Sequence, residues 1–133
     1  MTPFYCKLDD FDAYAYVNAL VAVAFSDGLH EDEAKYILQQ GLMLGVDAEP
    51  LLAEPGQALD MITGTSSLAT ARVVYRDCFI LAHVDGVVSE QELAVLGEIR
   101  KRLGVTVERA RALEAWAEQF TALLDDGEHL VLD

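Results

Sequence analysis

The stretch from Leu81 to Thr106, LAHVDGVVSEQELAVLGEIRKRLGVT, decides the fold. It predicts the end of one helix, a tight corner at Asp85-Gly86, a second helix and a stop at Gly104. A glycine at the corner adopts a positive φ without steric cost and so ends the helix before it. Ser89 and Glu92 fit a capping box, in which each side chain accepts a hydrogen bond from the backbone N–H of the other residue.

The helix behind this cap has a predicted buried face and a predicted ion pair. Apolar residues recur at helical spacing, namely Leu93, Leu96, Ile99 and Leu103. Glu98 precedes Arg102 by one helical turn, which favours an i,i+4 pair on the exposed face.

A looser copy of the same pattern lies earlier, from Val23 to Asp47, with its corner at Asp27-Gly28 and its stop at Leu44-Gly45-Val46. Its face is predicted to be buried at Ala34, Ile37, Leu38 and Gly41. The first copy lacks one residue after its corner, so Glu31 aligns with Glu90, and Glu33 with Glu92. His30 then takes the position of Ser89, which leaves the first helix without a good N-cap. We interpret the two copies as an internal duplication, spanning roughly residues 13–47 and 70–106.

The remaining periodicity predicts helices only, because no segment alternates with period two for long. The predicted helices cover Phe11–Ser26, Glu31–Leu44, Leu68–Val84, Ser89–Leu103 and Thr106 to about Leu124, with short turns begun by Pro50 and over Gln57–Ile62. We expect an all-α fold, a compact bundle of about six or seven helices in two pseudo-symmetric helix-corner-helix halves. Residues 1–133 are expected to form one domain. Residues Asp125–Asp133 are interpreted as an acidic tail whose apolar end docks on the body or on a neighbour.

The composition limits the classes of partner. The chain has 133 residues, 53% of them hydrophobic, and a net charge of −14. This charge argues against nucleic-acid and anionic-membrane binding, which need a basic surface. It is compatible with divalent cations, with a basic protein partner, or with a merely soluble acidic surface. The sequence leaves homo-oligomer formation open.

Neither the cysteines nor the termini suggest secretion or membrane insertion. The two cysteines, Cys6 and Cys78, show no zinc or redox spacing. No signal peptide is visible, and no stretch is apolar over about 18 residues. A cytoplasmic location is expected.

The duplicated acids of the two corners are the candidate functional residues. They are Asp27, Glu31 and Glu33 in the first copy, and Asp85, Glu90 and Glu92 in the second. If the halves pack about a pseudo-twofold axis, these carboxylates gather and favour Mg²⁺ or Ca²⁺. His30 and His83 lie beside the corners, where an imidazole would shift the preference towards a transition metal. The structural alternative is that the acids only cap helices and complement helix dipoles.

Other known patterns are absent. Residues 85–92 match the second half of an EF-hand loop, but the earlier ligand positions are His83 and Leu81, so the usual Ca²⁺ loop is not formed. The sequence has no phosphate-binding glycine-rich loop, no HExxH motif and no nucleophile elbow. We therefore expect a binding protein and not an enzyme.

The corner pattern resembles the tellurite-resistance TerB-like family, whose repeats carry ALADG, a Val or Ile, Ser and a Glu three residues after the Ser. Here it is carried by the run from Leu81 to Glu92, closing at Leu103-Gly104, and by Ala24-Phe25-Ser26-Asp27-Gly28. The resemblance spans about residues 13–124. It implies an all-helical fold of two intertwined halves, metal binding by Asp27, Asp85 and Glu92, and a stress-response role. Modules of this family also occur fused to J-domain co-chaperones.

These observations lead to two hypotheses. The first is a cytoplasmic TerB-like module that binds a divalent cation through its acidic corners. The second is a metal-free domain whose acidic face meets a basic protein.

Overall fold

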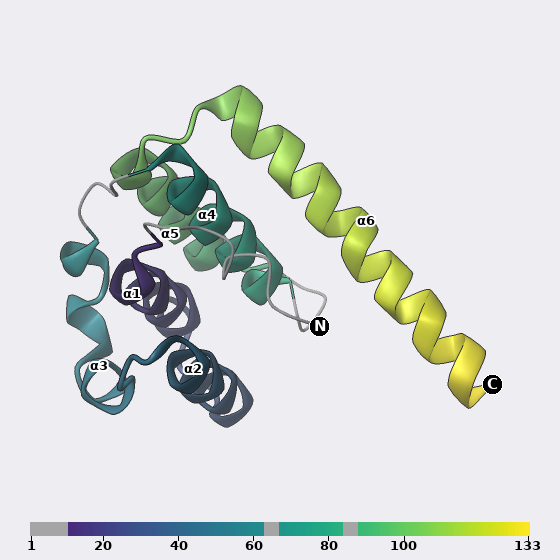
Figure 1. Cartoon of the computed structure of the whole chain (residues 1–133), viewed down its shortest axis with the longest axis horizontal. Coiled ribbons are helices and arrows are strands. Elements are labelled where there is room, and N and C mark those ends of the chain that lie inside the picture. Colours follow the sequence, from purple (N-terminus) through teal and green to yellow (C-terminus); the bar gives the residue numbers. More distant parts are fainter. Residues whose placement is uncertain (1–10, 63–66, 84–87) are drawn as a thin grey trace.

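The computed structural model describes residues 11–62, 67–83 and 88–133, and all regular secondary structure in this part of the chain is helical. Its elements are α1 (Ala13–Phe25), α2 (Glu31–Leu44), α3 (Glu49–Ala53), the 3₁₀ turns η2 (Pro55–Gln57) and η3 (Leu59–Met61), α4 (Leu68–Ala82), α5 (Glu90–Leu103) and α6 (Val107–Leu132). The all-α bundle predicted from the sequence is confirmed (Figure 1).

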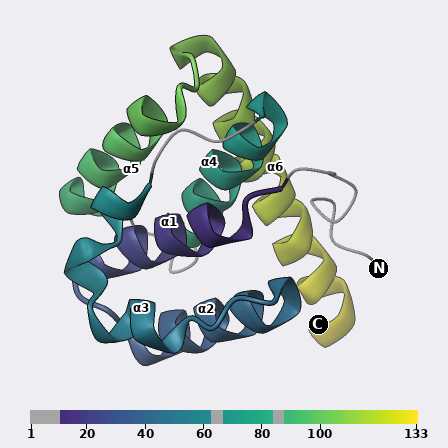
Figure 2. The same ribbon diagram turned by 60° about the vertical axis from the view of Figure 1, so that its left-hand side comes forward.

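Helix α1 is the centre of the core. Every residue from Ala15 to Ala24 is buried, because the sequence here is apolar on all sides and leaves no face that prefers water. Figure 2 shows α1 between a lower layer of α2 and α3 and an upper layer of α4 and α5. This central position confirms what the run LVAVAF predicts.

The two halves of the chain start their first helices in the same way. Asp12 Oδ1 accepts from the N–H of Ala15 over 3.0 Å at the start of α1. Ser67 Oγ accepts from the N–H of Thr70 over 3.0 Å at the start of α4. Each bond satisfies a backbone donor that has no partner inside its helix.

The second helices of the two halves also end alike. Gly45 and Gly104 have φ angles of 76° and 74°, in the left-handed region that glycine tolerates. Val46 N–H donates to Gly41 O over 2.8 Å, and Val105 N–H donates to Arg100 O over 3.1 Å. These are two Schellman endings, and α2 and α5 each have 14 residues. The pairing of Leu44-Gly45-Val46 with Leu103-Gly104-Val105 therefore has a structural counterpart.

Each of the two predicted buried faces contains one residue that is exposed. Ile37 and Gly41 are buried in α2, but Leu38 is exposed; Leu96, Ile99 and Leu103 are buried in α5, but Leu93 is exposed. In the first turn of α5 the buried side chain is Glu92, since it folds back onto its own N-cap. Arg102 bonds to Asp60 over 3.4 Å, so its partner comes from η3 and not from the predicted Glu98.

Helix α6 is longer than predicted. We expected it to end near Leu124, where its apolar periodicity stops and the predicted acidic tail begins. It continues to Leu132, and His129 bridges Asp125 and Asp133 over 3.6 Å and 2.8 Å along the helix surface. Trp116 is 46% exposed and stacks on Phe120 along the surface of this helix.

Three predictions lie outside the described residues: the N-terminal leader with Cys6, the loop at residues 63–66 and the corner glycine Gly86. Cys78 is buried, as its apolar surroundings predict. Among the described helices, none combines the length and the apolar character needed to cross a membrane.

Candidate functional site

The first Asp-Gly corner joins α1 to α2. After Phe25 the chain turns, Ser26 Oγ donates to Val23 O over 2.6 Å, and Gly28 N–H donates to Phe25 O over 3.1 Å. Gly28 has a φ of 100°, a conformation that residues with a Cβ rarely adopt. The predicted role of this glycine is confirmed, and the turn leaves Asp27 near the surface beside the start of α2.

The second corner is described only at its two flanks, because Asp85 and Gly86 lie outside the described residues. On the α4 side, His83 forms the C-cap, and its N–H donates to Ile80 O over 3.0 Å. Its Nδ1 lies 2.8 Å from Phe79 O, and its ring packs on the Phe79 ring with centroids 4.0 Å apart. These contacts fix the imidazole without any metal.

The α5 side of the second corner is a complete capping box. Ser89 Oγ accepts from Glu92 N–H over 3.0 Å, and Glu92 Oε1 accepts from Ser89 N–H over 3.1 Å. In the first repeat, Glu33 Oε1 accepts from the N–H of His30 over 3.3 Å. Glu33 and Glu92 are thus held in equivalent positions, and Glu92 is only 3% exposed.

The pKa of Glu33 is influenced by charges from both repeats. Burial raises the pKa of Glu33 above its usual 4.5, and the nearby charges of Asp27 and Glu92 raise it further; the His30 backbone bond and ring act in the opposite direction. Charges influence a carboxyl group in this way only over short distances. The charges that act on the Glu33 carboxyl group therefore come from both repeats, Asp27 from the first and Glu92 from the second.

Two of the weaker candidate residues are exposed carboxylates in the first turns of helices. Glu31 is exposed and pairs with Lys35 over 3.4 Å, one turn along α2. Glu90 is exposed in the first turn of α5. Both carboxylates complement the positive end of a helix dipole, which accounts for them without a ligand.

The side chains of Asp27, Glu33 and Glu92 suit a hard cation. Asp27, Glu33 and Glu92 offer only carboxylate oxygens, the donors that Mg²⁺ and Ca²⁺ prefer. Each glutamate uses one oxygen for its helix cap. Within residues 11–62, 67–83 and 88–133, no three His, Cys, Asp or Glu side chains already stand as a metal-binding group. The described acids therefore do not form a metal-binding group by themselves, and Asp85, the remaining predicted ligand, lies outside the described residues.

Sequence reasoning missed a cavity of about 410 Å³ between the end of α4 and α6. It is lined by Phe79, Ile80, His83, Ala117, Glu118, Thr121, Ala122 and Asp125. Glu118, Thr121 and Asp125 recur at helical spacing, beside the apolar face that includes Ala117. The spacing of these polar residues could have indicated the cavity. It was overlooked because the helix was predicted to end near Leu124, before Asp125.

Comparison of the chain with protein-family models, with curated proteins and with solved structures gives no significant match.

Proposed function

We propose that this chain is a TerB-like stress-response module of the tellurite-resistance type that binds a divalent cation between its two acidic corners. One observation carries the proposal most: the charges of Asp27 and Glu92, from different repeats, both act on Glu33. Three carboxylates held together repel one another, and a bound cation relieves that repulsion. The proposed ligands are Asp27, Glu33 and Glu92, together with Asp85.

The motif supports the family, and the site chemistry supports the class of ion. Two Asp-Gly corners followed by helices with equivalent first-turn glutamates are the features on which the resemblance to the TerB-like family rests. Oxygen-only donors favour Mg²⁺ or Ca²⁺ over transition metals. The proposed role is binding in the cytoplasm and not catalysis.

Calorimetry tests the cation site. Chelator-treated protein is titrated with Mg²⁺, Ca²⁺, Mn²⁺ and Zn²⁺, alongside Asp27→Asn and Asp85→Asn. Loss of an outer-shell partner alone weakens metal binding by about 10–100-fold, so loss of a ligand should weaken it at least tenfold. Asp32→Asn is the matched control, because it removes the same charge from the exposed first turn of α2. Absence of binding, or equal binding by all variants, would contradict the cation proposal.

The second candidate is a metal-free acidic domain that binds a basic protein. It is favoured by the net charge of −14 and by the helix-capping roles that already account for Glu33 and Glu92. An interface of this kind weakens as salt screens its charges. Absence of cation heat together with salt-sensitive capture of a basic protein would select this candidate over the first.

A further inference from the structure

The C-terminal part of α6 leaves the bundle. Figure 1 shows the helix running past the other elements, and every residue from position 118 to 133 is exposed. Several of these residues are large and apolar: Leu124 is 60% exposed, Leu130 is 87% exposed and Val131 is 83% exposed. A contiguous exposed apolar surface of this kind usually marks a binding site.

The exposed apolar residues continue the face that packs on the body. Ala110 and Ala117 are buried where α6 meets α4. Leu124 and Val131 follow at steps of seven residues, which places them on the same side of the helix. The seam that holds α6 to α4 therefore extends beyond α4, where no described residue covers it.

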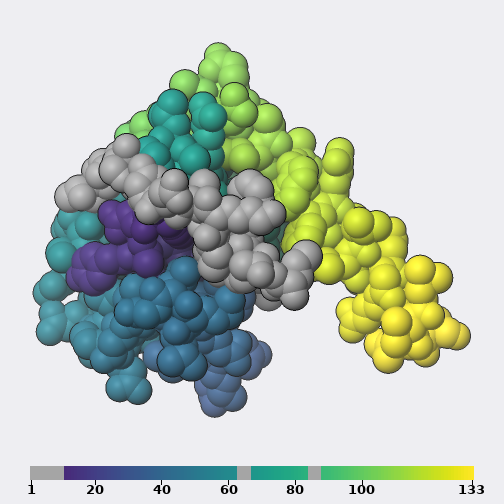
Figure 3. Space-filling view, viewed as in Figure 1, coloured from purple at the N-terminus to yellow at the C-terminus, as the bar shows by residue number. Residues whose placement is uncertain are grey.

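A groove lies alongside this seam. Its floor is the cavity of about 410 Å³ beside Phe79, Ile80 and Ala117. Figure 3 shows the end of α6 projecting clear of the rest of the molecule. Thr121 and Asp125 line the groove on the side of the cavity that leads towards the apolar end of the helix.

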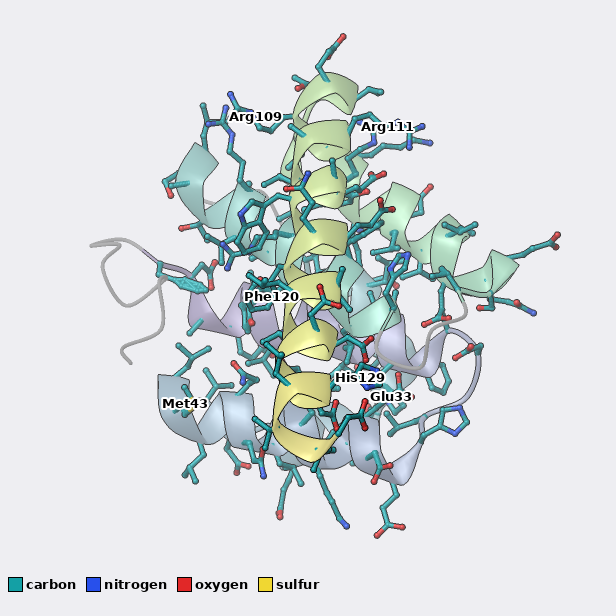
Figure 4. All side chains as sticks on the ribbon, turned by 90° about the vertical axis from the view of Figure 1, so that its right-hand side faces the viewer. Glu33, Met43, Arg109, Arg111, Phe120 and His129 are labelled. Carbon is teal, nitrogen blue, oxygen red and sulfur yellow. The ribbon has the colours of Figure 1, made fainter. Side chains whose placement is uncertain are left out.

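The negative charge of the groove favours a basic occupant. Glu118 and Asp125 line it, Asp126, Glu128 and Asp133 follow, and α6 has no Lys or Arg after Arg111. Figure 4 shows Arg109 and Arg111 at one end of α6 and His129 at the other. An identical chain laid antiparallel along this overhang would bring acids against acids, whereas a basic chain would find opposite charges.

We propose that this groove, formed by the end of α4 and the overhanging half of α6, binds a basic amphipathic helix of a partner protein. The apolar side of that helix packs on Leu124 and Val131, and its Lys or Arg residues meet Glu118 and Asp125. Helices commonly bind other proteins by laying an apolar face into such a groove. The inference uses none of the proposed metal ligands, and so it stands or falls separately from the cation proposal.

Nuclear magnetic resonance with the whole ¹⁵N-labelled chain tests this inference. The probe is a synthetic amphipathic peptide of about 14 residues made of Leu and Lys, with a Leu/Glu peptide of the same pattern as its control. The Leu/Lys peptide should shift the amide signals of residues 79–83 and 117–132, and the Leu/Glu peptide should not bind.

Variants separate a specific groove from general attraction to an acidic protein. Leu124→Gln combined with Val131→Gln keeps the net charge and suits a helix, and it should weaken Leu/Lys peptide binding at least tenfold. The matched control is Leu42→Gln, which changes an 83% exposed leucine of α2. It should bind as the unmodified chain does.

Three results would overturn the inference. Equal peptide binding by the double variant would reduce the effect to non-specific charge attraction. Binding of the Leu/Glu peptide would remove the requirement for a basic partner. A dimer seen by sedimentation in the unmodified chain and lost in the double variant would assign the apolar face to a second copy.

Discussion

At the scale of single residues, Glu33 stabilises a helix end while its own ionised form is destabilised by its surroundings. Its Oε1 accepts from the N–H of His30, which supports the start of α2. Burial and the charges of Asp27 and Glu92 nevertheless raise its pKa, so the ionised form is disfavoured in the folded protein. A partly buried carboxylate without a partner cation is a source of pH-dependent instability.

Glu33→Gln should change how stability depends on pH. Because the folded-state pKa of Glu33 is raised, the folded chain binds more protons than the unfolded chain above pH 4.5, and this residue's contribution to stability falls as pH rises through that range. Glutamine keeps the capping oxygen but does not titrate. Relative to the unmodified chain, the variant should therefore gain stability between about pH 4 and pH 7. Urea unfolding at both pH values measures this, and parallel pH profiles for the two chains would contradict it.

The buried carboxylate of Asp77 is better satisfied. The Tyr16 hydroxyl donates to Asp77 Oδ2 over 2.7 Å, and Arg76 Nε donates to Asp77 Oδ1 over 2.8 Å. The first of these bonds links α1 to α4, the first helices of the two halves. It could not be predicted from the sequence, because nothing in a run of apolar residues indicates which tyrosine meets which aspartate.

At the scale of elements, two helix glycines have opposite roles. A Cβ added at Gly41 of α2 would lie 2.6 Å from Val46 O and 3.3 Å from Ala48 Cβ. The first of these contacts is with the backbone of the Schellman ending, which would have to shift. Gly97 of α5 has open space around it.

The two alanine substitutions should therefore differ in sign. Gly41→Ala should lower the free energy of unfolding by about 1–3 kcal/mol, since overpacking forces a backbone shift. Gly97→Ala should raise it by about 0.4–1 kcal/mol, since it reduces the freedom of the unfolded chain at a helical position. Urea unfolding of both variants checks this, and a change of the same sign in both would show that the surroundings of Gly41 do not constrain it.

Helix boundaries were predictable where a cap or stop is encoded locally. Ser89 with Glu92, and Gly45 and Gly104, set the limits of α2 and α5 through contacts within a few residues. The end of α6 was not predictable in this way. Asp125-Asp126-Gly127 is typical of a stop, but the bonds of His129 to Asp125 and Asp133 carry the helix through it.

At the scale of the whole molecule, the two predicted sets of acids belong to helices that pack against the same central helix. Equivalent helices pack around the central α1, with α4 and α5 on one side of it and α2 on the other (Figure 2). The sequence predicted equivalent acids in the two repeats but not their approach, which depends on how the halves pack. The influence of Glu92 on Glu33 is the first sign of that approach.

The proposed cation site and the proposed groove are two different surfaces of the molecule. His83 lies between them, since it caps α4 beside the second corner and also lines the groove. Its ring is held by Phe79 in this position. The two surfaces are therefore joined through the end of α4.

The central claim is that residues from both repeats bind one cation, and paramagnetic relaxation by Mn²⁺ tests it most directly. With the ¹⁵N-labelled chain and substoichiometric Mn²⁺, amide signals should broaden together at residues 27–33 and 89–92, two segments far apart in the sequence. Asp27→Asn should abolish the broadening in both segments. Broadening confined to one repeat, or spread evenly over the acidic surface, would contradict the account.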